Sequence, residues 1–178
     1  MNQVAEALTP DFQWKQLSVH RWEHVLRAGD QVLITLKWRS GSGALAIAQT
    51  AEGAWEFNRT SLFDMRATLR STNSPTAAVF EPDFMGRGNL TFTDGREFKW
   101  HNPNFRMTAW QWLTREGTPI MGFEPCPEVS ATSPLNVEGY LKLMSPQLEQ
   151  SVLAAFGWYL ILLILHDAQL VSSMRVAA

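Results

Sequence analysis

Cysteine and charge are both scarce in this chain of 178 residues. Cys126 is its single cysteine, so no disulfide within the chain is possible and no oxidising compartment is needed. That cysteine lies between two prolines with no base beside it in sequence, which argues against a nucleophilic role. Charged residues make up 18% of the chain, below the ~25% typical of soluble domains, whereas apolar residues make up 46%. The composition therefore predicts one domain, residues 1–178, with a large core.

Signals for export and for nucleic-acid binding are also missing. Residues 1–8 lack the basic and apolar regions of a signal peptide, so we expect a cytoplasmic protein. The net charge of −2 argues against a nucleic-acid ligand, because such binders usually have a basic surface. Residues 37–115 nevertheless contain ten Lys or Arg against seven Asp or Glu. This local excess permits one mildly basic surface.

Short runs of alternating apolar and polar residues, separated by turn residues, extend from about residue 12 to 144. Period two places each apolar set on one side of a sheet. Asp94-Gly95 separates two such runs and predicts a hairpin with a two-residue type I′ turn. About twelve strands at this spacing predict a sandwich or barrel. The clearest apolar sets are Val32, Ile34, Leu36 and Trp38; Met65, Ala67 and Leu69; Leu90 and Phe92; Phe98 and Trp100; and Trp110 and Trp112.

The first segment permits two interpretations. Thr9-Pro10-Asp11 is a good helix start, with a capping residue followed by proline at the first helical position. A helix over residues 10–28, ending at Gly29, therefore competes with two strands.

The C-terminal segment lacks the alternating pattern of the rest of the chain. We expect a helix over about residues 147–168, in which Val152–Leu165 contains no charged residue. A helix that is apolar on all sides must be buried in protein or in lipid. Fourteen residues rise ~21 Å, less than the ~30 Å core of a bilayer, which favours protein. We therefore predict a mainly β fold, a closed barrel of about twelve strands that encloses this C-terminal helix and has no transmembrane segment. A membrane tail anchor is the rival hypothesis.

Three segments have a recognisable pattern: Gly88–Arg96, Trp110-Gln111-Trp112 before Glu116-Gly117, and Phe156–Leu160. Together they resemble the tubby C-terminal-like superfamily, which includes the tubby proteins, the phospholipid scramblases and the plant LURP-one-related proteins. The resemblance spans most of residues 12–168 and implies a barrel threaded by an apolar helix. It does not imply an enzyme, and in tubby itself it implies phosphoinositide binding through basic residues on neighbouring strands. Scramblase relatives have an acidic calcium-binding stretch before the helix, where this chain offers only Glu138 and Glu149.

One short motif has the spacing of a zinc site. His20, Glu23 and His24 match H-x-x-E-H, in which two histidines one helical turn apart bind zinc beside a catalytic carboxylate. In a strand, Glu23 would point away from the two histidines, and no third ligand is evident. We therefore expect no required metal and no cofactor.

Four basic residues are the candidate binding site. Arg66 and Arg70 alternate along one run, and Arg96 and Lys99 lie on the hairpin that follows. Guanidinium groups bind phosphate with two parallel hydrogen bonds, so such a patch suits an anionic lipid headgroup. A solvated strand face is the commoner origin of such charges. We predict a non-enzymatic module that binds an anionic phospholipid or a protein partner through its outer surface.

The alternative to a binding module is an enzyme with an unrecognised loop site. His101, Asn102 and Asn104 are close in sequence within a probable turn region and are the residues on which such a site would depend.

Overall fold

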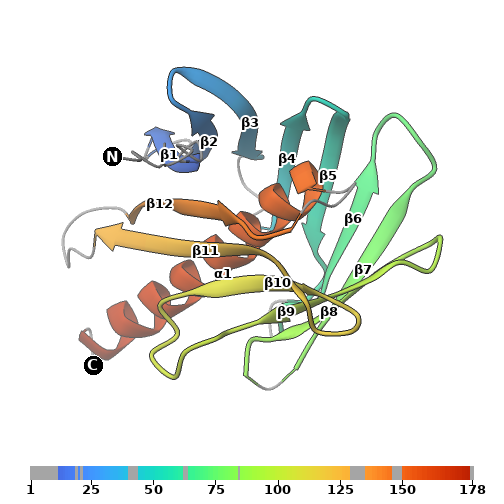
Figure 1. Ribbon diagram of the computed structural model, residues 1–178. Helices are drawn as coiled ribbons and strands as arrows, with labels where there is room; N and C mark the ends of the chain where they lie inside the picture. Colours follow the sequence, from blue (N-terminus) through green and yellow to red (C-terminus); the bar gives the residue numbers. More distant parts are fainter. Residues whose placement is uncertain are drawn as a thin grey trace, which may run out of the picture.

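Twelve antiparallel strands form a closed barrel in the computed structural model of the chain (Figure 1). The structure describes residues 12–18, 20, 22–39, 44–61, 64–83, 85–128, 135–145 and 150–176. The elements are β1 (Phe12–Ser18), β2 (Glu23–Ala28), β3 (Gln31–Trp38), β4 (Leu45–Thr50), β5 (Gly53–Arg59), β6 (Ala67–Ser71), β7 (Ala77–Pro82), β8 (Gly88–Phe92), β9 (Glu97–His101), β10 (Trp110–Thr114), β11 (Pro119–Glu128), β12 (Asn136–Leu143) and α1 (Gln150–Val176).

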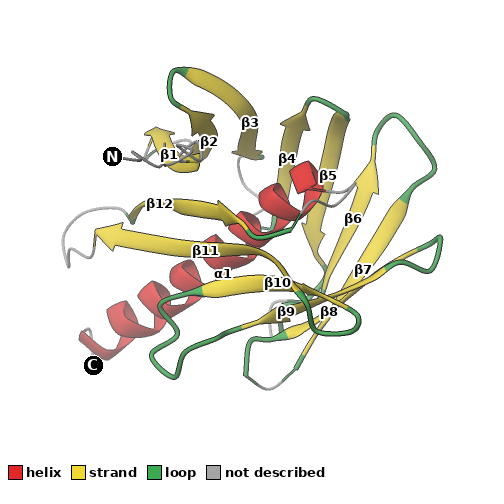
Figure 2. Cartoon of the chain, in the orientation of Figure 1, coloured by secondary structure: helices red, strands yellow, loops and turns green. Residues whose placement is uncertain are grey.

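Each strand pairs with the next in sequence, and β1 pairs with β12 to close the sheet. Among the described residues, one helix, α1, follows all the strands and runs through the barrel (Figure 2). It contacts β3, β4 and β5 on one side and β10 and β11 on the other. Every side chain from Val152 to Leu163 is buried, apart from Gly157, which has none. The predicted barrel with a buried apolar helix is therefore confirmed.

Aromatic rings fill the space between helix and sheet. Phe156 contacts rings from three strands, and Trp158 stacks on Trp14 of β1 with ring centroids 5.3 Å apart. Gly157 lets the helix approach β10 and β11, because a Cβ atom there would lie 2.8 Å from Nε1 of Trp112 and even closer to the ring of Phe123. Glycine weakens a helix interior by about 1 kcal/mol, so its presence here is explained by packing.

The helix is longer than the predicted 147–168, since it continues to Val176. Its 27 residues rise roughly 40 Å, and no glycine or proline interrupts it after Gly157. By length and composition alone, Gln150–Met174 suffices to cross a membrane, yet 67% of its most apolar window is buried inside the structure. The interior of the barrel is thus the apolar environment that the uncharged part of the helix requires.

Two local features differ from the sequence prediction. The hairpin at Asp94-Gly95 is present, but its loop has three residues. The amide of Gly95 donates to the carbonyl of Phe92 at 3.0 Å, and Gly95 is the only one of the three loop residues with positive φ. This is a type I turn followed by a left-handed residue, not a type I′ turn. In β3, a bulge opposite Leu26 and Arg27 shifts the register, so Val32 is exposed and does not share the buried face.

The first segment forms two strands, β1 and β2, and no helix spans the described part of residues 10–28. Cross-strand pairing explains this outcome, because Trp14 lies opposite Leu26 and both side chains are buried against the core. Residues 9–11, on which the helix hypothesis depended, lie outside the described residues.

Candidate functional site

The two ends of the barrel differ in their connections. In an up-and-down barrel alternate connections lie at the same end. At one end the strands are joined by tight turns, and Ser151 at the start of α1 donates a hydrogen bond to Glu52 there. At the other end, here called the loop end, lie the β7–β8 connection (residues 83–87) and the β9–β10 connection (residues 102–109). The C-terminal part of α1 leaves the barrel at the loop end (Figure 1).

The β9–β10 connection is held in a fixed shape by its own side chains. The amide of Thr108 donates to Oδ1 of Asn104 at 3.1 Å, and Nδ2 of Asn104 donates to the hydroxyl of Thr108 at 2.9 Å. Oδ1 of Asn102 accepts from the amide of Asn104 at 2.9 Å. Met107 has φ of 54°, a conformation that a non-glycine residue adopts only when its surroundings impose it. The side-chain hydrogen bonds therefore hold the loop in one conformation, with backbone strain at Met107.

That tip is apolar and fully exposed. Phe105 has a relative exposure of 102%, and Met107, two residues further along, is also exposed. Met85 on the neighbouring β7–β8 connection is a third exposed apolar side chain. Arg106, between the two apolar residues, is exposed and forms no ion pair with any described residue. An aromatic ring held in water on a rigid loop indicates a contact surface.

The emerging end of α1 adds a second apolar surface at the loop end. Leu170, Val171 and Met174 are all exposed, although the helix is still well formed around them. Arg59 fixes the exit of the helix, because its guanidinium binds both carboxylate oxygens of Asp167 at 2.8 and 3.0 Å. The loop end thus combines a rigid loop tip with a firmly anchored helix end.

The predicted basic residues lie on the outer surface, but they are spread out. Arg66 precedes β6 and lies 3.7 Å from Glu81, while Arg70 lies further along β6 directly opposite Glu56. Four residues of strand separate the two arginines by roughly 13 Å. Each of the two arginines therefore lies beside a carboxylate, and the arginines are not neighbours of each other.

The other two basic residues are also apart. Arg96 binds Asp94 and places its guanidinium 4.7 Å from the ring centroid of Phe92. This hydrogen bond lowers the pKa of Asp94. Lys99 lies on β9, three strands from β6, which corresponds to about 14 Å across the sheet. The structure does not bring the four side chains into one cluster.

The remaining sequence candidates do not assemble a reactive centre. His24 is buried in β2, whereas His20 is exposed in a turn, so the two lack the helical spacing of the zinc motif. No group of three His, Cys, Asp or Glu that could hold a metal is found in the part of the chain described. Cys126 is exposed, and its sulfur lies 3.8 Å from the carbonyl oxygen of Glu124. Glu138 is on β12, and Glu149 lies outside the described residues.

The sequence analysis named His101, Asn102 and Asn104 as the residues of a possible enzyme site, and they lie at the end of β9 and in the β9–β10 connection. Asn104 shapes the β9–β10 connection, and His101 ends β9 without an ion pair to a described residue. The residue that it missed is Phe105. An aromatic residue inside the turn cluster Asn102-Pro103-Asn104, outside any alternating pattern, was the available signal.

Comparison of the chain with protein-family models, with curated proteins and with solved structures found no match. The resemblance to the tubby-like superfamily therefore stays a prediction.

Proposed function

We propose that the chain is a non-enzymatic module that docks reversibly on lipid surfaces through the loop end of the barrel. The exposed ring of Phe105 on its rigid loop is the observation that supports this function most directly. Met107 and Met85 extend the apolar tip, and Arg106 supplies a positive charge suited to lipid phosphates.

The expected affinity follows from the size of this surface. Full burial of a phenylalanine side chain contributes about 2 kcal/mol, and each partly exposed methionine contributes less. One arginine beside an anionic bilayer adds about 1 kcal/mol. Binding of this strength is weak and reversible, comparable to that of a single acyl anchor. Because the apolar term dominates, salt should weaken binding only modestly.

Vesicle co-sedimentation tests the proposal. The wild-type protein should sediment with phosphatidylcholine vesicles and about fivefold better when phosphatidylserine is included, since 1 kcal/mol corresponds to about fivefold. Phe105→Ser should lower partitioning about 30-fold. Arg106→Gln should abolish the preference for phosphatidylserine without abolishing binding to phosphatidylcholine.

Matched controls come from the outer wall of the barrel. Val79→Ser removes an exposed apolar side chain of β7, and Arg70→Gln removes a cation of β6, and neither should affect sedimentation. Equal sedimentation of wild type and Phe105→Ser would refute the proposal. Absence of vesicle binding would favour a protein partner for the same surface.

A further inference from the structure

The last turns of α1 continue beyond the strand that anchors them. β5 ends at Arg59, which binds Asp167 of the helix, and α1 extends about two turns further. Leu170, Val171 and Met174 are three, four and seven residues after Asp167, so they lie on the same face of the helix as Asp167. Their relative exposures are 47%, 51% and 72%. These three residues, here called the helix-end stripe, are therefore an apolar face that continues past the end of β5.

The polar groups of this segment are satisfied within the helix. Residues 168–174 contain no charged side chain. The hydroxyl of Ser172 donates to the carbonyl oxygen of Ala168 at 3.0 Å, and that of Ser173 donates to the carbonyl oxygen of Gln169 at 2.9 Å. Bonds of this kind let serine occupy helices in an apolar medium, where every polar group needs an internal partner. The segment therefore exposes apolar side chains and keeps its hydroxyl protons for itself.

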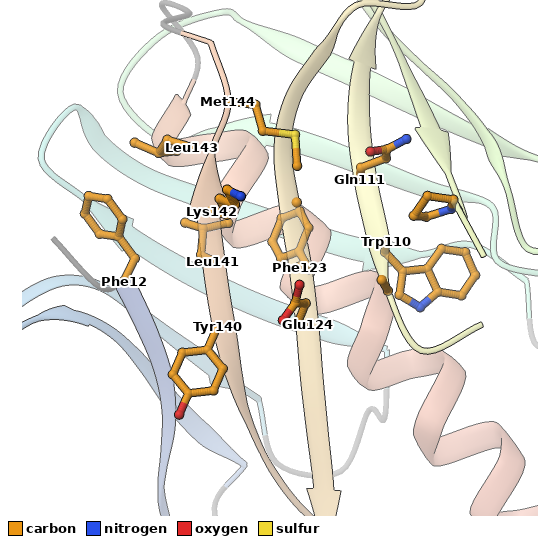
Figure 3. A pocket seen from close by; sticks show the side chains of 13 residues that line it. Phe12, Trp110, Gln111, Phe123, Glu124, Tyr140, Leu141, Lys142, Leu143 and Met144 are labelled. Atoms are coloured by element: carbon orange, nitrogen blue, oxygen red, sulfur yellow. The ribbon is translucent and has the colours of Figure 1, made fainter. Parts of the chain in front are cut away.

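Exposed apolar side chains on the outer wall of the barrel differ from the helix-end stripe. Met144, which follows β12, reaches across β11, and a Cβ atom at Gly122 would lie 2.8 Å from its methyl group (Figure 3). Met144 thus packs on the sheet although it is partly exposed. The helix-end stripe instead lies beyond the end of β5 and is exposed at three positions of one face.

We propose that the helix-end stripe enters the same bilayer that the Phe105 tip contacts, as a second point of attachment. This inference rests on the proposed lipid docking and extends it. Residues 168–174 rise about 10 Å, which matches the 5–10 Å to which amphipathic helices enter the boundary between headgroups and acyl chains. Two observations favour a bilayer over a protein partner. The stripe belongs to the loop end, from which Phe105 also projects, and Ser172 and Ser173 direct their hydroxyl protons to the helix backbone.

Two attachment points fix the orientation of the barrel. The pair of Arg59 with Asp167 holds the helix end to the sheet, and the hydrogen bonds of Asn104 hold the loop that carries Phe105. Because both contacts belong to one rigid body, the first contact brings the second to the surface, so their affinities reinforce each other. The loop end then faces the membrane, and the tight-turn end faces water.

A double variant of the stripe measures its contribution to vesicle binding. Leu170→Ser with Val171→Ser should lower partitioning to mixed phosphatidylcholine and phosphatidylserine vesicles about 20-fold, because two half-exposed apolar side chains are lost. Val32→Ser with Val79→Ser is the matched control, since these valines have relative exposures of 51% and 42% on β3 and β7. The control variant should sediment like the wild type.

A fluorescent probe reports whether the stripe enters the bilayer. Cys126→Ser removes the single cysteine, so one labelling position can be introduced at a time. An environment-sensitive fluorophore on Met174→Cys should shift to shorter wavelength with vesicles and be quenched by lipids spin-labelled near the headgroup. The same fluorophore on Thr91→Cys, on the exposed face of β8, should do neither.

The outcomes separate this inference from the proposed function. Wild-type sedimentation of the stripe variant, or an unshifted probe at position 174, would overturn the inference, while a loss of binding in Phe105→Ser would still support docking by the loop. The opposite pattern would support the stripe and refute the loop tip. Absence of wild-type binding would overturn both. A dimer in sedimentation velocity that the stripe variant abolishes would also overturn the inference, because a second copy would then cover the stripe.

Discussion

The side chain of His24 is fully buried, and we expect its protonation to lower the stability of the fold in acid. It lies in β2 opposite Gln16 and Leu36, with its ring 6.3 Å from that of Trp158. Neither ring nitrogen has a hydrogen-bond partner among the residues described. Burial therefore disfavours the charged imidazolium and lowers the pKa of His24 from 6.5 to about 4.

The sign of the effect follows from proton binding. Between pH 6.5 and about 4 the unfolded chain binds a proton at His24 and the folded chain does not, so acid favours unfolding. Above pH 6.5 the contribution to stability is fully present, and it is lost as the pH falls through this window. At about 1.4 kcal/mol per pH unit, the total loss is on the order of 3 kcal/mol.

Urea unfolding monitored by tryptophan fluorescence from pH 7 to pH 4 measures this loss. Other carboxylates contribute to the wild-type profile, so the informative quantity is the difference between wild type and His24→Leu. That difference should shift in favour of the variant by about 1.4 kcal/mol per pH unit below 6.5. His20→Leu, at an exposed turn, is the matched control and should follow the wild type. Parallel profiles for wild type and His24→Leu would refute the reasoning.

Three further predictions concern the helix. Gly157→Ala should lower the free energy of unfolding by about 2 kcal/mol, measured by urea denaturation, because the clash with fixed rings outweighs the gain in helix propensity. Asp167→Ala should lower the free energy of unfolding by about 2 kcal/mol, because the almost buried guanidinium of Arg59 loses this carboxylate. Asp30→Ala removes a carboxylate from an exposed ion pair and should change stability little. The wild type should purify without detergent, and Leu160→Asp should yield no folded protein by near-ultraviolet circular dichroism, because a buried unpaired charge costs several kcal/mol. Recovery of the wild type only from membranes, or a folded Leu160→Asp variant, would contradict this.

The fold was predictable because the sequence contains two strong patterns, the alternation of apolar residues in the strands and the apolar segment near the C-terminus. Alternation at Leu90 and Phe92 or at Trp110 and Trp112 identifies the inner face of each strand, and these side chains are buried. An apolar segment such as Val152–Leu163 has no polar face to expose, so only an enclosing sheet satisfies it in water. Failures arose where one residue changes the register, as at Val32, which the β3 bulge turns outward.

The candidate surfaces were less predictable, because they depend on which strands are neighbours. Sequence spacing groups Arg66 with Arg70, but the pairing of strands places Glu81 and Glu56 beside them. Lys142 and Glu124 are 18 positions apart in the sequence, and the register of β11 with β12 brings them to the same face of neighbouring strands. The alternation of apolar and polar residues shows on which face of its strand a residue lies. It does not show which residue lies beside it on the neighbouring strand.

The order of elements has a consequence for synthesis. The segment that fills the barrel follows all twelve strands, so the ribosome makes it after them. Until then the inward-facing tryptophans and phenylalanines have no helix to pack against, and unpaired strands with exposed apolar faces are prone to aggregate. Closure also requires β1 to meet β12, a pairing between distant parts of the chain that slows folding. We therefore expect the barrel to reach its final packing only after α1 has emerged from the ribosome.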